Sequence, residues 1–177
     1  LETASLAAFL GNCPVVEAQG FLYPVKIIYR GTASLLPIPQ QAASAVLEQL
    51  DDKNSQGDVL VFLPGEREIF GTLEILENSR HAGSVDFLPL YGAMSLDRQD
   101  AVLKPGRKRK VILATNIAET SITIEGVTTV IDSGWCRKMR FDPVTGLDRL
   151  ELCRITLDSA EQRAGRAGRL GPGKALR

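Results

Sequence analysis

The chain has 177 residues, and 21 Lys and Arg side chains balance 21 Asp and Glu side chains. Hydrophobic residues make up 44% of the chain and aromatic residues 6%, which fits one globular domain and excludes a collagen-like, disordered or disulfide-stapled protein. The three cysteines are widely spaced and form no CxxC pair, so we expect neither a zinc site nor a disulfide framework, and a cytoplasmic location.

The charge is unequally divided along the chain. Residues 1–103 carry 6 basic and 13 acidic side chains, whereas residues 104–177 carry 15 and 8. A basic half of this kind commonly faces phosphate, although a solvated surface with segregated charges explains the counts equally well. No apolar run approaches the roughly twenty residues that span a bilayer, so no membrane partner is expected.

Strand and helix patterns alternate from residue 25 onward. The patterns predict, in chain order, a strand at 25–29, a helix at 37–50, a strand at 58–63, a helix at 66–78, a strand at 85–90, a helix at 96–103, and strands at 110–114 and 127–131. This order predicts an α/β fold with a doubly wound, mostly parallel sheet, which binds ligands at the carboxyl ends of its strands.

Two further segments depart from this alternation. Residues 137–141 and 147–153 flank a turn rich in Pro and Gly, which predicts an antiparallel β-hairpin added to the sheet. Residues 1–23 lack a strong period, and we expect them to be a linker or the tail of another domain.

The most specific run is QRAGRAGR at residues 162–169. In a helix capped by Asp158 or Ser159, one face would present the Gln162 amide and the Arg166 and Arg169 guanidiniums in a line. Interleaved glycines cost a helix about 1 kcal/mol each, so we interpret them as room for close approach of a large anion such as phosphate. A solvated basic helix with small residues for packing is the alternative.

The overlapping run GRLGPGKA at residues 168–175 nearly matches a phosphate-binding loop. It lacks the final Ser or Thr that binds magnesium, and a helix rather than a strand is predicted before it. We therefore reject that interpretation, and the chain is expected to have no triphosphate cradle of its own.

A second polar run, ATNIAETSITIEG at residues 114–126, follows a predicted strand. Its short hydroxyl and amide side chains suit nucleic-acid phosphates, but taken alone the run fits better a polar loop whose side chains bond to its own backbone.

The two runs together resemble motifs V and VI of the DEAH/RHA helicases of superfamily two. FLPG at residues 62–65 is similar to motif IV of that family, and the resemblance covers nearly the whole chain. YGAMSL at residues 91–96 and FDPVTGL at residues 141–147 look most like the bacterial HrpB type.

The resemblance implies a domain organisation and partners. Residues 24–177 would form the second RecA-like domain, with its β-hairpin at about 137–153, and residues 1–23 would be the linker or tail of the first. ATP or another nucleoside triphosphate, with Mg²⁺, would be bound mainly by that first domain. Single-stranded RNA and the C-terminal domains of the same protein are the other implied partners, in a protein that we expect to be monomeric.

The resemblance also implies individual roles. Gln162 would position the attacking water, and Arg166 and Arg169 would act as arginine fingers. Ser121 and Glu125 match positions that sense the γ-phosphate and the ribose, and Leu103 matches a position where eukaryotic members stack a Phe on the base. The implied nucleic-acid contacts are Gly92, Thr115, Asn116, Arg137, Lys138 and Arg140. A DNA translocase lobe and a binding module without catalysis remain alternative functions.

Overall fold

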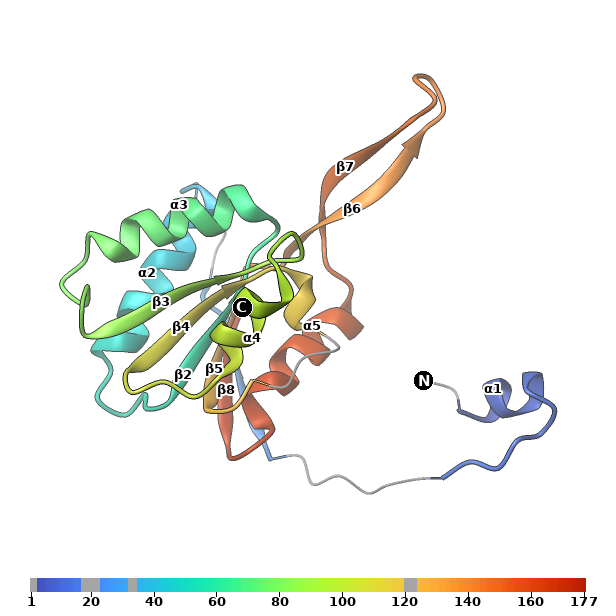
Figure 1. Ribbon diagram of the computed structural model, residues 1–177, viewed down its shortest axis with the longest axis horizontal. Coiled ribbons are helices and arrows are strands. Elements are labelled where there is room, and N and C mark those ends of the chain that lie inside the picture. The colour runs from blue at the N-terminus through green and yellow to red at the C-terminus, as the bar shows by residue number, and fades with distance from the viewer. Residues whose placement is uncertain (1–2, 17–22, 32–34, 120–123) are drawn as a thin grey trace.

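The computed structural model describes residues 3–16, 23–31, 35–119 and 124–177. These residues form an α/β unit from which one β-hairpin projects (Figure 1). The elements are α1 (Thr3–Phe9), β1 (Val25–Ile28), α2 (Ile38–Asp51), β2 (Asp58–Phe62), α3 (Glu66–Glu77), β3 (Val85–Leu90), α4 (Leu96–Leu103), β4 (Arg109–Ala114), the 3₁₀ turn η1 (Asn116–Ala118), β5 (Val127–Asp132), β6 (Trp135–Asp142), β7 (Leu147–Arg154), α5 (Leu157–Gly165), the 3₁₀ turn η2 (Arg166–Gly168) and β8 (Gly173–Leu176).

The main sheet confirms the predicted fold class. Within the described residues it has six strands in the order β1-β8-β5-β2-β4-β3, and every neighbouring pair is parallel. The strand β8 was not predicted from the sequence. It overlaps the end of the run at residues 168–175, where a phosphate-binding loop would instead lead into a helix.

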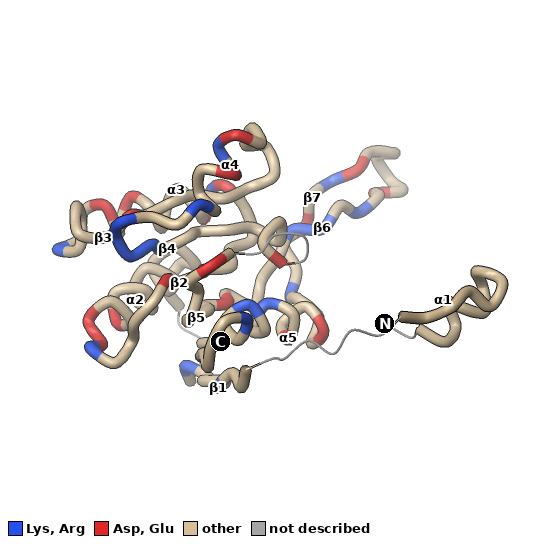
Figure 2. Tube along the Cα trace, turned by 60° about the horizontal axis from the view of Figure 1, so that its bottom comes forward, with Lys and Arg blue, Asp and Glu red and all other residues tan. Residues whose placement is uncertain are grey.

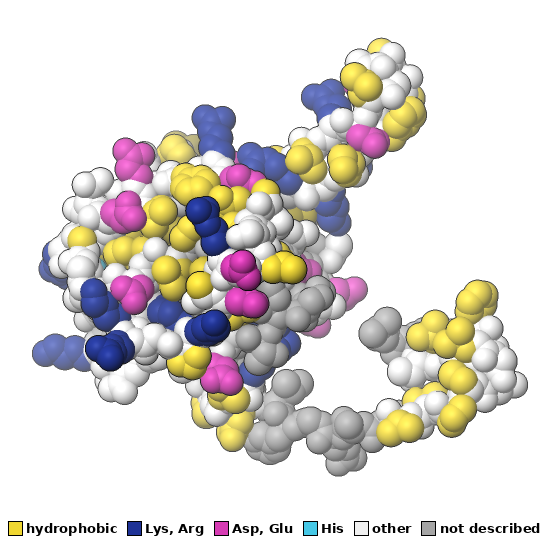
Figure 3. Space-filling model, viewed as in Figure 1, with side chains coloured by type: hydrophobic (Ala, Val, Ile, Leu, Met, Phe, Trp, Pro, Cys, Tyr) yellow, Lys and Arg dark blue, Asp and Glu magenta, His cyan; other side chains and the backbone are white. Residues whose placement is uncertain are grey.

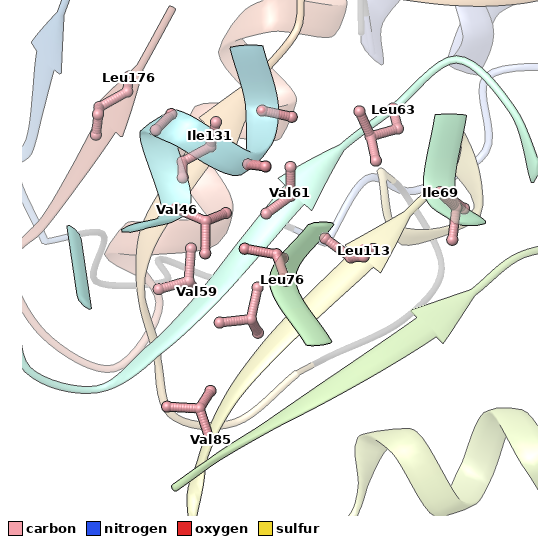
Figure 4. Packing of buried hydrophobic residues seen from close by; sticks show 14 residues of the cluster. Val46, Val59, Val61, Leu63, Ile69, Leu76, Val85, Leu113, Ile131 and Leu176 are labelled. Atoms are coloured by element: carbon pink, nitrogen blue, oxygen red, sulfur yellow. The ribbon is translucent and has the colours of Figure 1, made fainter. Parts of the chain in front are cut away.

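The central strand β2 is buried on both faces of the sheet, because its alternate side chains point to opposite sides and pack into two different clusters. Val59 and Val61 belong to a buried cluster with α2 and α3, seen in Figure 4, whereas Leu60 and Phe62 belong to a second cluster with α4, α5 and η2. All four side chains are 0% exposed. A strand buried on both faces requires a continuous apolar sequence, which is the pattern that identified this strand.

The hairpin also confirms the prediction. Strands β6 and β7 pair in antiparallel register from Trp135 opposite Arg154 to Asp142 opposite Leu147. Asp142 stabilises the turn, because its carboxylate accepts a hydrogen bond from the backbone of Val144 at 2.9 Å. The hairpin extends away from the sheet as an arm (Figure 1).

The N-terminal segment contains a short helix, α1, that the sequence pattern did not predict. No residue of α1 is buried. Among the helices that the structure describes, none combines the length and the apolar character needed to cross a bilayer.

Candidate nucleotide and nucleic-acid interface

The carboxyl ends of β3 and β4 bring together three of the predicted nucleic-acid contacts. The backbone N–H of Thr115 donates to the carbonyl of Leu90 at 3.1 Å, which joins the loops that follow these two strands. Gly92 and Asn116 are exposed in these loops, and Thr115 is half-buried. The predicted positions therefore share one edge of the sheet, at the place where a doubly wound fold binds ligands.

Of the three residues expected to contact the nucleotide, the structure describes two. Ser121 lies outside the described residues. Glu125 is exposed just before β5, whereas Leu103 is half-buried at the end of α4 and packs against the second core cluster. Part of the Leu103 side chain is thus occupied in packing within the domain.

Helix α5 begins earlier than predicted. Its N-cap is Thr156, whose hydroxyl accepts a hydrogen bond from the backbone N–H of Ser159 at 3.3 Å, so the prediction of Asp158 or Ser159 as the cap was wrong. The helix ends at Gly165, and the chain continues as the tighter turn η2. Because a 3₁₀ turn has fewer residues per turn than an α-helix, the angular spacing assumed for residues 162–169 changes at this point.

The amide and the two guanidiniums therefore differ in exposure instead of forming one exposed row. Gln162 is exposed and Arg169 is half-buried, whereas Arg166 is only 4% exposed. The Arg166 guanidinium donates from Nε, at 3.2 Å, and from Nη2 to the backbone carbonyl of Glu119, in the loop after β4. The second arginine of the run is thus docked onto the loop that resembles motif V.

The electrostatic setting of Arg166 is unfavourable for a cation. Burial lowers the pKa of Arg166 from its ordinary value, and the neighbouring positive charge of Arg169 lowers it further, while Glu119 acts in the opposite direction. Both leading effects oppose the charged form. An anion placed beside these two guanidiniums would favour the charged form of Arg166 and so oppose both effects.

The sequence analysis missed Arg163, which forms the centre of a buried network. Its side chain is 1% exposed. Its Nε donates to Glu119 at 2.9 Å and its Nη1 to Asp132 at 2.9 Å, and its guanidinium lies 4.8 Å from the centre of the Phe62 ring. The hydroxyl of Ser159 also donates to Glu119, at 2.7 Å. The network connects α5, the loop after β4 and the end of β5.

The spacing of buried residues could have revealed Arg163. Ala160, Ala164 and Ala167 are buried, and Arg163 stands within this stripe rather than on the opposite side. A cation on the apolar side of a helix indicates a buried partner of opposite charge.

One glycine of the same run, Gly168, has a different role from the one predicted. A Cβ on Gly168 would lie 2.6 Å from the backbone oxygen of Tyr23 and 2.7 Å from the side chain of Val25. Gly168 therefore permits close packing of η2 against the chain entering β1, rather than the approach of an anion. A Cβ on Gly165 would meet nothing within 4 Å.

The hairpin arginines are engaged with carboxylates. Arg137 forms a two-point ion pair with Glu68 of α3, and Arg140 lies 3.4 Å from Glu151 across the hairpin. Lys138 is exposed. Figure 2 shows basic positions alternating with acidic ones along β6 and β7, so the hairpin is not a continuous positive surface.

Hydrophobic side chains also reach the surface of the hairpin. Met139, Phe141 and Leu150 are 61–68% exposed, and Figure 3 shows apolar atoms on the projecting end. Met139 lies opposite Leu150 in the register of the hairpin, so these two side chains share a face.

A hollow of about 700 Å³ lies beside the root of the hairpin, on the α2 side of the sheet. Its lining includes Arg30, Asp132, Trp135 and Arg154, but none of the residues predicted to bind nucleotide or nucleic acid. The candidate interface is therefore an open edge of the sheet and not this hollow.

Comparison with known proteins identifies the family. The model of the helicase conserved C-terminal domain matches residues 41–171. The chain is 45% identical to the ATP-dependent RNA helicase HrpB of Escherichia coli over 99% of this chain and 22% of that protein. It is 40% identical to the human probable ATP-dependent RNA helicase DHX34 over 100% of this chain and 16% of that protein.

The solved structures agree with this assignment. The crystal structure of the Escherichia coli DEAH/RHA helicase HrpB superposes with a TM-score of 0.88 at 43% identity, covering 99% of this chain and 22% of that one. The chain thus spans about a fifth of the length of these relatives, from 16% to 22%. It belongs to the helicase conserved C-terminal domain family, in the DEAH/RHA type that HrpB represents.

Proposed function

We propose that the chain is the C-terminal RecA-like lobe of an ATP-dependent RNA helicase, and that it supplies arginine fingers to a nucleoside triphosphate held by a first lobe. The observation that carries this proposal is the state of Arg166, a buried cation beside a second cation, Arg169, with two of its nitrogens on a neutral carbonyl. A phosphate offers a guanidinium full opposite charge and two-point geometry, neither of which a neutral carbonyl provides. An arriving phosphate would therefore compete well for this guanidinium.

The chemistry assigned to the chain is positioning and charge neutralisation. Gln162 would orient the attacking water, while Arg166 and Arg169 would neutralise charge that develops on the transferring phosphoryl group. Mg²⁺ and most of the triphosphate would be held by the first lobe. Ser121 is proposed to sense the γ-phosphate, and the remaining proposed nucleotide contacts are Glu125 with the ribose and Leu103 with the base.

The RNA is proposed to follow the carboxyl edge of β3 and β4. Gly92, Thr115 and Asn116 would contact its phosphate backbone without reading its sequence, as short polar groups and backbone N–H groups commonly do. Lys138 and Arg140 of the hairpin would add positive charge. The similar proteins of Escherichia coli and human are named as RNA helicases, which favours RNA over duplex DNA.

The test is Arg166→Ala in the full-length protein, with nucleotide hydrolysis and RNA affinity measured separately. Removing an arginine finger lowers kcat by about 10³–10⁵-fold, and RNA binding is expected to change little. Arg80→Ala is the matched control, because the Arg80 side chain is 73% exposed and pairs with Asp51, apart from both motifs.

Three results would overturn the proposal. Near-normal hydrolysis by the Arg166 variant would remove the finger from the mechanism. Hydrolysis by the unaltered protein that duplex DNA stimulates, but single-stranded RNA does not, would indicate a DNA translocase. A full-length protein that binds RNA without hydrolysing nucleotide would indicate a binding module.

A further inference from the structure

The root of the hairpin is joined to α3 by a partly buried ion pair. Nη1 and Nη2 of Arg137 lie 2.7 Å and 3.0 Å from the two carboxylate oxygens of Glu68. The two side chains are 28% and 12% exposed. Two parallel hydrogen bonds between a guanidinium and a carboxylate fix orientation as well as distance, which a single contact does not.

The guanidinium reaches Glu68 across the bare backbone of Gly65. A Cβ on Gly65 would lie 1.8 Å from Nη1 of Arg137 and 3.3 Å from the nearer oxygen of Glu68. The backbone of Gly65 is extended, with φ −174° and ψ 177°, a conformation open to any residue. A side chain at this position would therefore displace the Arg137 guanidinium, so the glycine provides space and not backbone freedom.

We infer that Gly65, Glu68 and Arg137 form a strut that sets the direction in which the hairpin projects from the lobe. Gly65 is the last residue of the FLPG run between β2 and α3, and the strut gives that glycine a specific purpose. Arg137 is in this assignment a positioning residue of the hairpin and not a contact for RNA. The neighbouring cations, Lys138 and Arg140, lie further out along the arm.

The geometry of the arm makes its root important. About six residues separate Arg137 from the turn, so at roughly 3.4 Å per residue the arm extends about 20 Å beyond the strut. A rotation of about 10° at the root would move the tip by about 3–4 Å over that length. If the proposed helicase function holds, a displacement of this size would move the hairpin relative to the RNA.

The experiment measures the direction of the arm itself in the full-length protein. Spin labels are attached through a genetically encoded keto amino acid at two exposed positions. One is Val144, which lies in the turn and is 92% exposed, and the other is Glu77, at the end of α3. Electron–electron double resonance between the two labels reports the distance from the tip of the arm to the lobe. Gly65→Ala and Arg137→Ala are each expected to shift or broaden this distance by about 3–4 Å, the lever-arm displacement.

The double variant provides the decisive comparison. With Arg137 already replaced by Ala, the methyl group of Gly65→Ala meets no guanidinium and has only an oxygen of Glu68 near it, at 3.3 Å, so the double variant should match Arg137→Ala alone. Gly171→Ala is the matched control, because a Cβ there meets nothing within 4 Å, and it should match the unaltered protein. An unchanged distance in both single variants, or an equal effect of Gly65→Ala with and without Arg137, would overturn the strut.

This readout does not depend on catalysis. A protein that hydrolyses no nucleotide would refute the proposed function and still permit the test of the strut. In an active protein, Arg137→Ala is further expected to reduce the base pairs unwound per nucleotide hydrolysed.

Discussion

Arg163→Met is expected to destabilise the fold strongly. The arginine side chain is 1% exposed and bonded to Glu119 and Asp132, whose side chains are 16% and 2% exposed. Methionine retains the apolar stem but removes the charge, and it leaves the carboxylate of Asp132 buried without its partner.

The size of the effect follows from the burial of these groups. Removing one member of a buried ion pair costs about 3–5 kcal/mol, since the other charge stays desolvated. In a chain of this length each kcal/mol lowers Tm by about 2–4 °C, so Tm should fall by about 6–20 °C. That loss is a large part of the roughly 5–15 kcal/mol that stabilises a typical domain.

The measurement is urea unfolding of the chain, with Arg140→Met as the control. Arg140 and Glu151 are 76% and 40% exposed at 3.4 Å, and an exposed pair of this kind contributes about 0–1 kcal/mol. Adding Asp132→Asn to Arg163→Met should recover part of the lost stability, because the unpaired charge is removed. Equal losses for Arg163→Met and Arg140→Met would refute the reasoning.

Three other predictions concern packing and thiol chemistry. In urea unfolding, Gly165→Ala should stabilise the chain by about 0.4–1 kcal/mol, because a methyl group there meets open space. Gly168→Ala should destabilise the chain, because a Cβ there would lie 2.6 Å from a backbone oxygen. The opposite order of stabilities would contradict the packing described. Iodoacetamide at neutral pH should label the exposed Cys13 before the buried Cys136. Burial raises the pKa of the Cys136 thiol, so its reactive thiolate forms only at higher pH. Equal labelling rates of the two cysteines, measured by mass spectrometry, would contradict this order. Lys110→Met should lower the stability of the chain by about 1–3 kcal/mol in thermal or urea unfolding. The lysine is 4% exposed, and its ammonium donates to two carbonyls at the end of α4, at 3.0 and 2.9 Å. An unchanged stability would show that water replaces the ammonium as the donor to these carbonyls.

The fold could be predicted because its signals are local. The strand β2 lies in a nearly continuous apolar run between Gly57 and Pro64, and the hairpin turn contains Pro143 and Gly146. Local patterns of this kind report burial and turn geometry directly. The strand β8 was missed because it is only four residues long and begins at Gly173, directly after a proline.

The details of the site depend on residues far apart in the sequence. Arg163 finds its partners 44 and 31 residues away, at Glu119 and Asp132, and no pattern in the run QRAGRAGR specifies them. Gly168 packs closely against the chain entering β1, and no local pattern shows that contact. Arg137 pairs with Glu68, which lies 69 residues before it in the sequence. The sequence therefore indicated which segments carry the candidate site, but not which of their side chains face the lobe itself.

The most direct test of the central claim is a crystal structure of the full-length protein with ADP, Mg²⁺ and tetrafluoroaluminate, which imitates the transferring phosphoryl group. The proposed function predicts that Arg166 and Arg169 lie within hydrogen-bond distance of the fluorides, with Gln162 beside the attacking water. A nucleotide enclosed between the two lobes with neither guanidinium in contact with it would contradict the claim.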